Sequence, residues 1–147
     1  MNVIGRPATP WHLWVVGVVS LLWNAVGAND YTQTSLRNEA YLESMGFPPE
    51  GMAYIDAFPA WAHAGWALGV WGALIGSILL LLRKRHAVWA FAVSLVGIAL
   101  TTAYEQTTEV PPELAAAQPG WFPLVLWGIA LFLMWYAWTM QKKGVLL

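Results

Sequence analysis

Residues 59–85 read PAWAHAGWALGVWGALIGSILLLLRKR, a largely apolar stretch that begins at a proline and ends on three consecutive cations. A helix crosses the hydrocarbon core of a bilayer with about 20 residues, so this stretch is long enough to span it. Pro59 suits a first helical turn, and Trp61 stands where an interfacial anchor is expected. The stretch therefore predicts a transmembrane helix over about residues 59–82.

Three further stretches of the same kind occupy about residues 11–30, 86–104 and 120–141. Of the 147 residues, 59% are hydrophobic and 10% are charged, whereas an ordinary soluble domain has about 25% charged residues. The 11 tryptophans agree with this, because Trp is enriched where a bilayer meets water. We predict an all-α fold, a four-transmembrane-helix bundle that forms a single integral membrane domain over residues 1–147 and has the lipid bilayer as its partner.

The charged residues sort onto the two sides of these four spans. Six of the seven cations flank the spans on one side: Arg6, Arg83, Lys84, Arg85, Lys142 and Lys143. The eight acids lie in or beside the two opposite loops, together with Arg37: Asp30, Glu39, Glu43, Glu50, Asp56, Glu105, Glu109 and Glu113. Cytoplasmic loops carry an excess of Lys and Arg, so the N and C termini are predicted to be cytoplasmic.

An alternative interpretation of the first span is a cleaved secretory signal. Val26-Gly27-Ala28 has the small residues of a cleavage site and follows an apolar run. A signal peptide has a positively charged segment before that run, and Arg6 is a weak one. The run from Trp11 to Ala28 is long enough to span a bilayer, which favours a transmembrane helix.

The first outer loop, residues 31–58, is long for a connection in so small a chain and is expected to have structure of its own. Within SLRNEAYLESMG, Leu36 and Tyr41 stand at helical spacing. Ser35 is available as an N-cap and Gly46 as a C-cap. We predict a short amphipathic outer helix in this segment.

Two other parts of the outer loops receive simpler predictions. The segment PEGMAYIDAF is expected to form a further helical piece that runs into the second span with a kink at Pro59. The second outer loop, residues 105–118, carries two consecutive prolines and is expected to be a plain solvated connection.

Small residues predict how the helices pack, because helices in a bilayer associate through close van der Waals contact. The second span has four glycines spaced four, three and four residues apart, on one helical face: Gly65, Gly69, Gly72 and Gly76. The third span repeats the pattern with Ala90, Ser94, Gly97 and Thr101, and the first span with Gly17, Ser20, Asn24 and Gly27 or Ala28. We therefore expect spans one to three to meet along these stripes.

Polar and aromatic side chains near the outer ends of the spans are candidates for a binding site, since polar groups in a membrane are expensive and functional by default. Six share a similar depth by the helical rise of about 1.5 Å per residue: Trp23, Asn24, Asp30, His63, Trp66 and Trp127. If they face inward, they line a vestibule suited to a small neutral hydroxylated or amphipathic solute.

Structural roles are open for the two most polar of these residues. Asn24 would also stabilise the packing of two helices by a hydrogen bond to Ser94 or to a backbone carbonyl. His63 lies on the helical face away from the glycines, together with Asp56 and Ser77, and is either a proton-responsive partner of Asp56 or a satisfied interfacial histidine. His12 and His86 stand at cytoplasmic helix ends without carboxylates nearby, far in depth from His63, so no metal site is predicted, and no cofactor.

The sequence has no signature of an enzyme or of a nucleic-acid binder. It lacks a Gly-rich phosphate loop, a nucleophile elbow and an HExxH pattern, so no catalytic residues are predicted. Its cations sit at helix ends rather than in a basic stripe. It has no cysteine for a disulfide or a thiolate metal site.

Three stretches carry a resemblance to a known family: PWHLWVVGVVSLLWNAVGANDY, QTSLRNEAYL and FPAWAHAGWALGVWGALIGSILLLLRKR. The chain from Pro10 to Tyr104 resembles small uncharacterised bacterial inner-membrane proteins with four helices, which often bear the automatic label "sugar transporter". The matching positions are Asn24, Asp30, Tyr31, Arg37, Asn38, Glu39, Tyr41, Pro59 and Trp61. The resemblance implies a bacterial inner-membrane location and gives no catalytic or binding residues to transfer.

Two functions remain open from the sequence. One is the binding or transport of a small solute from the outer side, sugar-like if the family label holds, by a homo-oligomer. The other is a non-transporting accessory or assembly subunit of a larger membrane complex. The cytoplasmic halves of the spans are almost wholly apolar apart from Ser20, Ser77 and Ser94, which favours the accessory subunit or a site open only to the outside.

Overall fold

The computed structural model describes residues 7–117 and 119–147, and every regular element in that part of the chain is an α-helix. Four helices are long: α1 (Trp11–Ser35), α4 (Ala60–Leu81), α5 (His86–Thr107) and α7 (Phe122–Lys142). Each is long and apolar enough to cross a membrane, so the chain is a multi-pass membrane protein. The predicted all-α class and its four spans are confirmed. Arg6, expected among the cytoplasmic cations, lies outside the described residues.

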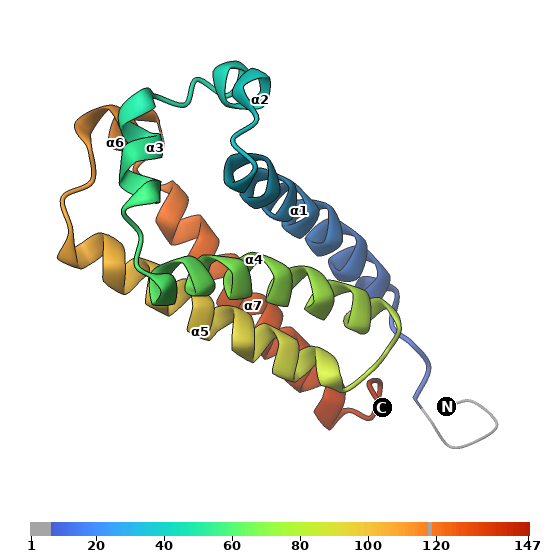
Figure 1. Ribbon diagram of the computed structural model, residues 1–147. Helices are drawn as coiled ribbons and strands as arrows, with labels where there is room; N and C mark the ends of the chain where they lie inside the picture. The colour runs from blue at the N-terminus through green and yellow to red at the C-terminus, as the bar shows by residue number, and fades with distance from the viewer. Residues whose placement is uncertain (1–6, 118) are drawn as a thin grey trace.

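The connections divide the molecule into two ends (Figure 1). At the loop end lie three short helices: α2 (Glu39–Ser44), α3 (Pro49–Asp56) and α6 (Pro112–Ala117). At the terminal end lie residues 7–10, the α4–α5 turn and residues 143–147. The backbone of Leu147 bonds to Arg83 and Arg85 in that turn, so both described ends of the chain lie beside the tight connection between α4 and α5.

The first long connection differs from its predicted form. Helix α1 continues to Ser35, well past the expected end near residue 30, so the predicted N-cap Ser35 is its last residue. The cap of α2 is Asn38, whose side chain accepts a hydrogen bond from the Tyr41 amide. Gly46 follows α2 with φ of 69°, the left-handed conformation expected of a helix-ending glycine. The outer helix therefore exists, but it is shorter and begins later.

The two other loop predictions also need correction. Helix α3 ends at Asp56 and does not run into α4, because Pro59 has extended backbone dihedrals and caps a new helix. The connection between α5 and α7 is not plain, since it contains α6. The Leu114 side chain of α6 lies close to Gly51 of α3, so the two connections pack on each other.

Helix α4 occupies the centre of the bundle, and its glycine face lies against α5. A Cβ atom on Gly65 would stand 3.0 Å from the carbonyl oxygen of Gly97, and one on Gly72 would stand 3.1 Å from that of Ala90. Ser94 donates a hydrogen bond of 2.6 Å to the carbonyl oxygen of Gly69 across the same interface. The two backbones therefore touch along the interface, which only small residues permit.

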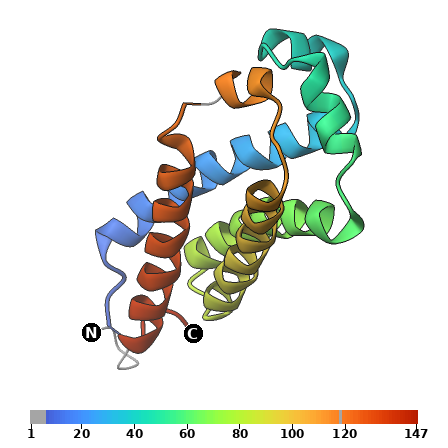
Figure 2. The same cartoon turned by 90° about the vertical axis from the view of Figure 1, so that its left-hand side faces the viewer.

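Helix α1 packs on a different face of α4. Its small-residue stripe is buried there: Gly17, Ser20, Asn24 and Ala28. The stripes of α1 and α5 thus meet α4 on two separate faces, with the glycine face of α4 against α5 and the face of Ala73 and Ser77 against α1. Helix α7 packs mainly on α5 and is inclined to α1, as Figure 2 shows.

The core is densest toward the terminal end. Its buried side chains come from all four long helices and include Leu13, Leu80, Phe91 and Leu133. His12 Nδ1 and the Tyr136 hydroxyl share a hydrogen bond that joins α1 to α7 at this level. The apolar core therefore closes the terminal end, whereas polar groups collect at the loop end.

Candidate functional site

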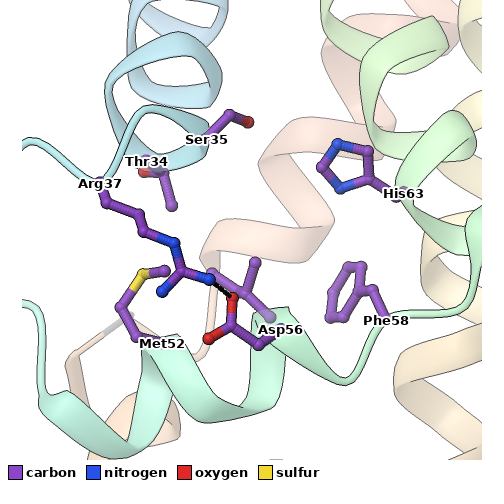
Figure 3. A pocket seen from close by; sticks show the side chains of 8 residues that line it. Thr34, Ser35, Arg37, Met52, Asp56, Phe58 and His63 are labelled. Atoms are coloured by element: carbon purple, nitrogen blue, oxygen red, sulfur yellow. Dashed lines mark hydrogen bonds and ion pairs between the residues drawn. The ribbon is translucent and has the colours of Figure 1, made fainter.

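A pocket of about 270 Å³ opens at the loop end between the end of α1, helix α3 and the start of α4 (Figure 3). Its lining combines charged, hydroxyl and apolar groups: Thr34, Ser35, Arg37, Met52, Ile55, Asp56, Phe58 and His63. A concave site with a few polar groups on an apolar wall is the usual form of a small-molecule site. Of the six sequence-predicted site residues, His63 lines it.

An ion pair between Arg37 and Asp56 forms the polar centre of the pocket (Figure 3). Arg37 follows the end of α1 and has φ of 55°, a conformation uncommon for a residue with a side chain. Asp56 ends α3, so the pair joins the two helices. The side chains are 61% and 43% exposed, so the pair contributes little to stability but is accessible to a ligand.

The apolar side of the pocket is built around Phe58. Phe58 lies in the segment between α3 and α4. Its ring centroid lies 4.7 Å from that of Tyr104 and 5.4 Å from that of Tyr54. The Tyr54 hydroxyl shares a 2.7 Å hydrogen bond with the Thr108 hydroxyl, which holds α3 against the end of α5. These contacts fix the wall that faces the ion pair.

His63 and its neighbours join α1 to α4 behind the pocket. His63 Nε2 lies 3.1 Å from the Tyr31 hydroxyl, and the Tyr31 and Trp66 ring centroids are 4.8 Å apart in an edge-to-face arrangement. Asp56, the proton-responsive partner suggested by the sequence, pairs with Arg37 instead. The hydrogen-bonded, interfacial role of His63 is therefore the one that the geometry matches.

Asp30 binds the outer helix rather than the pocket. The Tyr41 hydroxyl donates a 2.9 Å hydrogen bond to its carboxylate, which fastens α2 to the end of α1. Burial raises the pKa of Tyr41 above its ordinary value of 10.0, and the neighbouring Asp30 carboxylate raises it further. The folded state therefore holds the phenol proton more tightly than the unfolded chain does.

This raised pKa predicts a pH-dependent contribution of Tyr41 to stability. The contribution is fully present below the ordinary tyrosine pKa and is lost as pH rises through the raised value. We expect Tyr41→Phe to be less stable than the wild type near neutral pH, and the difference to vanish in strongly alkaline solution. Unfolding in detergent across this pH range measures it, and a difference that stays constant would show that the hydrogen bond to Asp30 contributes nothing.

The three remaining predicted residues lie away from the pocket. Asn24 is buried between α1 and α4, where its amide donates to the Ala73 carbonyl at 3.1 Å and to the Ser77 hydroxyl at 2.8 Å. Trp23 faces Phe122 of α7. Trp127 donates a 3.2 Å hydrogen bond to Thr102 of α5. Of the six residues, the structure brings His63 and Trp66 together, whereas Trp23, Asn24, Asp30 and Trp127 make separate contacts.

The sequence carried a partial signal for the pocket residues that were not predicted as a site. Arg37 is the only cation among the acids of the two loops, which makes a partner nearby expected. The sequence has eight acids, and identifying Asp56 as the partner of Arg37 required knowledge of the path of the chain between α1 and α3. Among the described residues, no three His, Asp or Glu side chains gather as metal ligands would. No known family model, curated protein or solved structure matches the chain.

Proposed function

We propose that this chain is a solute-binding protein of the bacterial inner membrane. Its N and C termini face the cytoplasm, and its loop-end pocket takes a small neutral, hydroxylated, sugar-like solute from the outer side. The observation that carries the proposal is the pocket of about 270 Å³ with an accessible Arg37–Asp56 pair opposite an aromatic wall. A volume of this size is close to the lower limit of common ligand sites, which favours a compact solute.

The chemistry of the lining favours a neutral ligand with hydroxyl groups. The charges of Arg37 and Asp56 balance each other, so the pocket gives neither a cation nor an anion a net attraction. The guanidinium offers several donors and the carboxylate offers acceptors, which together match neighbouring hydroxyls on one solute. The Phe58 ring provides an apolar surface for the C–H face of such a molecule.

Binding is favoured over conduction by this chain alone. Below the pocket, the Asn24 side chain fills the α1–α4 interface with hydrogen bonds to Ala73 and Ser77. The α4–α5 interface is filled by contacts at backbone distance around Gly97. All the buried side-chain nitrogen and oxygen atoms in the described part of the chain have hydrogen-bond partners, which leaves no spare polar groups for a moving solute.

Solute binding is tested by intrinsic tryptophan fluorescence and thermal shift with a panel of sugars and polyols. Trp66 lies directly behind His63 and should report occupancy of the pocket. Asp56→Asn removes the charge but keeps the size, and should weaken binding of a responding solute about fivefold by the loss of a charge-assisted hydrogen bond. Glu43→Gln, an equal charge change on exposed α2, should leave binding unchanged.

Two results would contradict the proposal. If the wild-type protein responds to no member of the panel, the pocket is not a binding site for a sugar-like solute. Equal weakening by Asp56→Asn and Glu43→Gln would place binding elsewhere on the loop end.

The proposed orientation predicts which single cysteines react in intact cells, and the native chain has no cysteine to interfere. Ser44→Cys on α2 and Ala116→Cys on α6 should react with a membrane-impermeant thiol reagent added outside. Lys84→Cys in the α4–α5 turn should react only after the membrane is opened. The reverse pattern would overturn the orientation, because all three side chains are exposed in the structure.

An accessory subunit of a larger membrane complex is the second proposal. It is favoured by the almost wholly apolar cytoplasmic halves of the spans, which offer a solute no polar path. Native mass analysis after gentle extraction separates the two functions. A retained protein partner supports the accessory role, whereas a retained small molecule supports solute binding.

A further inference from the structure

Helices α1 and α7 enclose an apolar groove between them, here called the α1–α7 seam, with a volume of about 290 Å³. It is lined by Val16, Val19 and Trp23 of α1 and by Ile129, Phe132 and Leu133 of α7. Ser20, a polar residue in the lining, donates its hydroxyl to the Gly17 carbonyl of its own helix at 3.1 Å. The seam therefore offers no free polar group to a solute and suits a hydrocarbon.

The size of the seam limits what can enter it. A helix with its side chains is about 10–12 Å wide, so two turns of it occupy roughly 800 Å³ or more. The open groove between α1 and α7 has a volume of about 290 Å³, so a helix from a second copy would lie over it with only its side chains inside. A single flexible acyl chain needs no such width, and the surrounding bilayer supplies one.

The α7 side of the seam leads to a positive charge at the terminal end. Ile129, Phe132, Tyr136 and Lys143 are spaced three, four and seven residues apart and so share one helical face. The exposed Lys143 stands 11 residues beyond Phe132, about 16 Å along the axis, which is close to half of the roughly 30 Å hydrocarbon core. A headgroup at Lys143 would therefore place its acyl chain in the seam within one leaflet.

The charge around this position is of one sign. All eight acidic residues lie in the loop-end connections or in the last two turns of α1 or α5. Arg83 lies at the terminal end, where it donates a 2.7 Å hydrogen bond to Thr9 just before α1. The terminal end thus carries cationic side chains, among them Arg83 and Lys143, and no acidic side chain. This is the arrangement that attracts the phosphate of an anionic lipid.

We propose that the α1–α7 seam binds one acyl chain of an anionic phospholipid whose phosphate lies on Lys143, beside Arg83. The proposal does not depend on the loop-end pocket, because the two sites share no residue and the seam leads toward the opposite end of the bundle. Its partner is a lipid from the leaflet at the terminal end rather than a solute or a second protein chain.

Thermal unfolding in detergent with added lipid tests the proposal. Phosphatidylglycerol should raise the midpoint by several degrees, whereas phosphatidylcholine with the same acyl chains should not. Lys143→Gln should lower the affinity for phosphatidylglycerol about fivefold, which corresponds to the loss of one Lys near a phosphate. Lys84→Gln removes an equal charge at the same end, in the α4–α5 turn rather than on α7, and should leave the affinity nearly unchanged.

The acyl-chain contact needs a separate pair of variants. Val19→Phe fills the seam from α1 and should weaken binding of the same lipid by at least severalfold. Val96→Phe is the matched control on α5, since Val96 is 57% exposed and Val19 is 61% exposed, and it should bind like the wild type.

Four outcomes would overturn the proposal. Equal shifts of the unfolding midpoint with the two lipids would show that the headgroup charge plays no part in binding. Equal weakening by Lys143→Gln and Lys84→Gln would reduce it to a general basic surface. Wild-type affinity in Val19→Phe would show that the acyl chain does not bind in the seam. A stable dimer without bound lipid would show that a second copy of the chain covers this face.

Discussion

Gly97→Leu is expected to be among the most damaging single substitutions in the bundle. A Cβ atom at Gly97 would collide with the Gly65 carbonyl oxygen and the Gly69 amide nitrogen, and would lie 3.0 Å from the Gly69 Cα. Both neighbours are backbone atoms in the centre of α4 and cannot rotate away. The two helices must separate, so we expect a loss of about 3 kcal/mol or more in stability in detergent, at or above the upper end of overpacking effects.

Gly128→Leu is the matched control for this substitution. Gly128 lies in the middle of α7, and a Cβ atom there would have no heavy atom within 4 Å, so leucine should be accommodated with little change. The helix propensity of leucine exceeds that of glycine, so a small gain is expected. Equal unfolding midpoints for Gly97→Leu, Gly128→Leu and the wild type would show that α4 and α5 do not meet at backbone distance.

The second large effect is expected from Asn24→Ala. The substitution removes two hydrogen bonds between α1 and α4, to Ala73 and Ser77, and leaves a small void in a buried interface. Interhelical hydrogen bonds in membranes are worth about 0.6–1.7 kcal/mol each, so a total of roughly 2 kcal/mol is expected. Because Asn24 does not line the loop-end pocket, the response to a bound solute should stay as in the wild type.

Asn29→Ala on the same helix controls for the chemical change, since Asn29 is exposed and should tolerate it. A double-mutant cycle with Ser77→Ala would isolate the hydrogen bond between the two side chains. Loss of solute response in Asn24→Ala at unchanged stability would contradict the structural role and restore Asn24 to the binding site.

The glycines of α4 illustrate how far a local pattern reaches. Their spacing was sufficient to define one face of the helix, because side chains three and four residues apart lie together on any α-helix. That face lies against α5 in the structure, at Gly97 and Ser94. The pattern could not show that α1 would choose a different face of α4, because this depends on Ser77 and Ala73, which carry no periodic signal.

The depth of each residue along its helix could not predict the loop-end pocket. Asn24 and His63 stand at similar heights in their helices, yet Asn24 bonds to Ser77, and His63 bonds to Tyr31, 32 residues earlier in the chain. The rise per residue gives a height but no direction around the axis. The ion pair joins residues 19 apart, just after the end of α1 and at the end of α3, with α2 between them, so it too depended on the path of the loop.

The number and approximate position of the four spans follow from the sequence, because apolarity over about 20 residues is a local property that suits a segment to the bilayer. The charge difference between the two ends is equally local. Three features depend on tertiary contacts instead: where α1 ends, which faces of α4 are occupied, and that Arg37, Asp56, Phe58 and His63 line one pocket. Helices in lipid associate through complementary shape and individual hydrogen bonds. Both depend on side chains that are far apart in the chain.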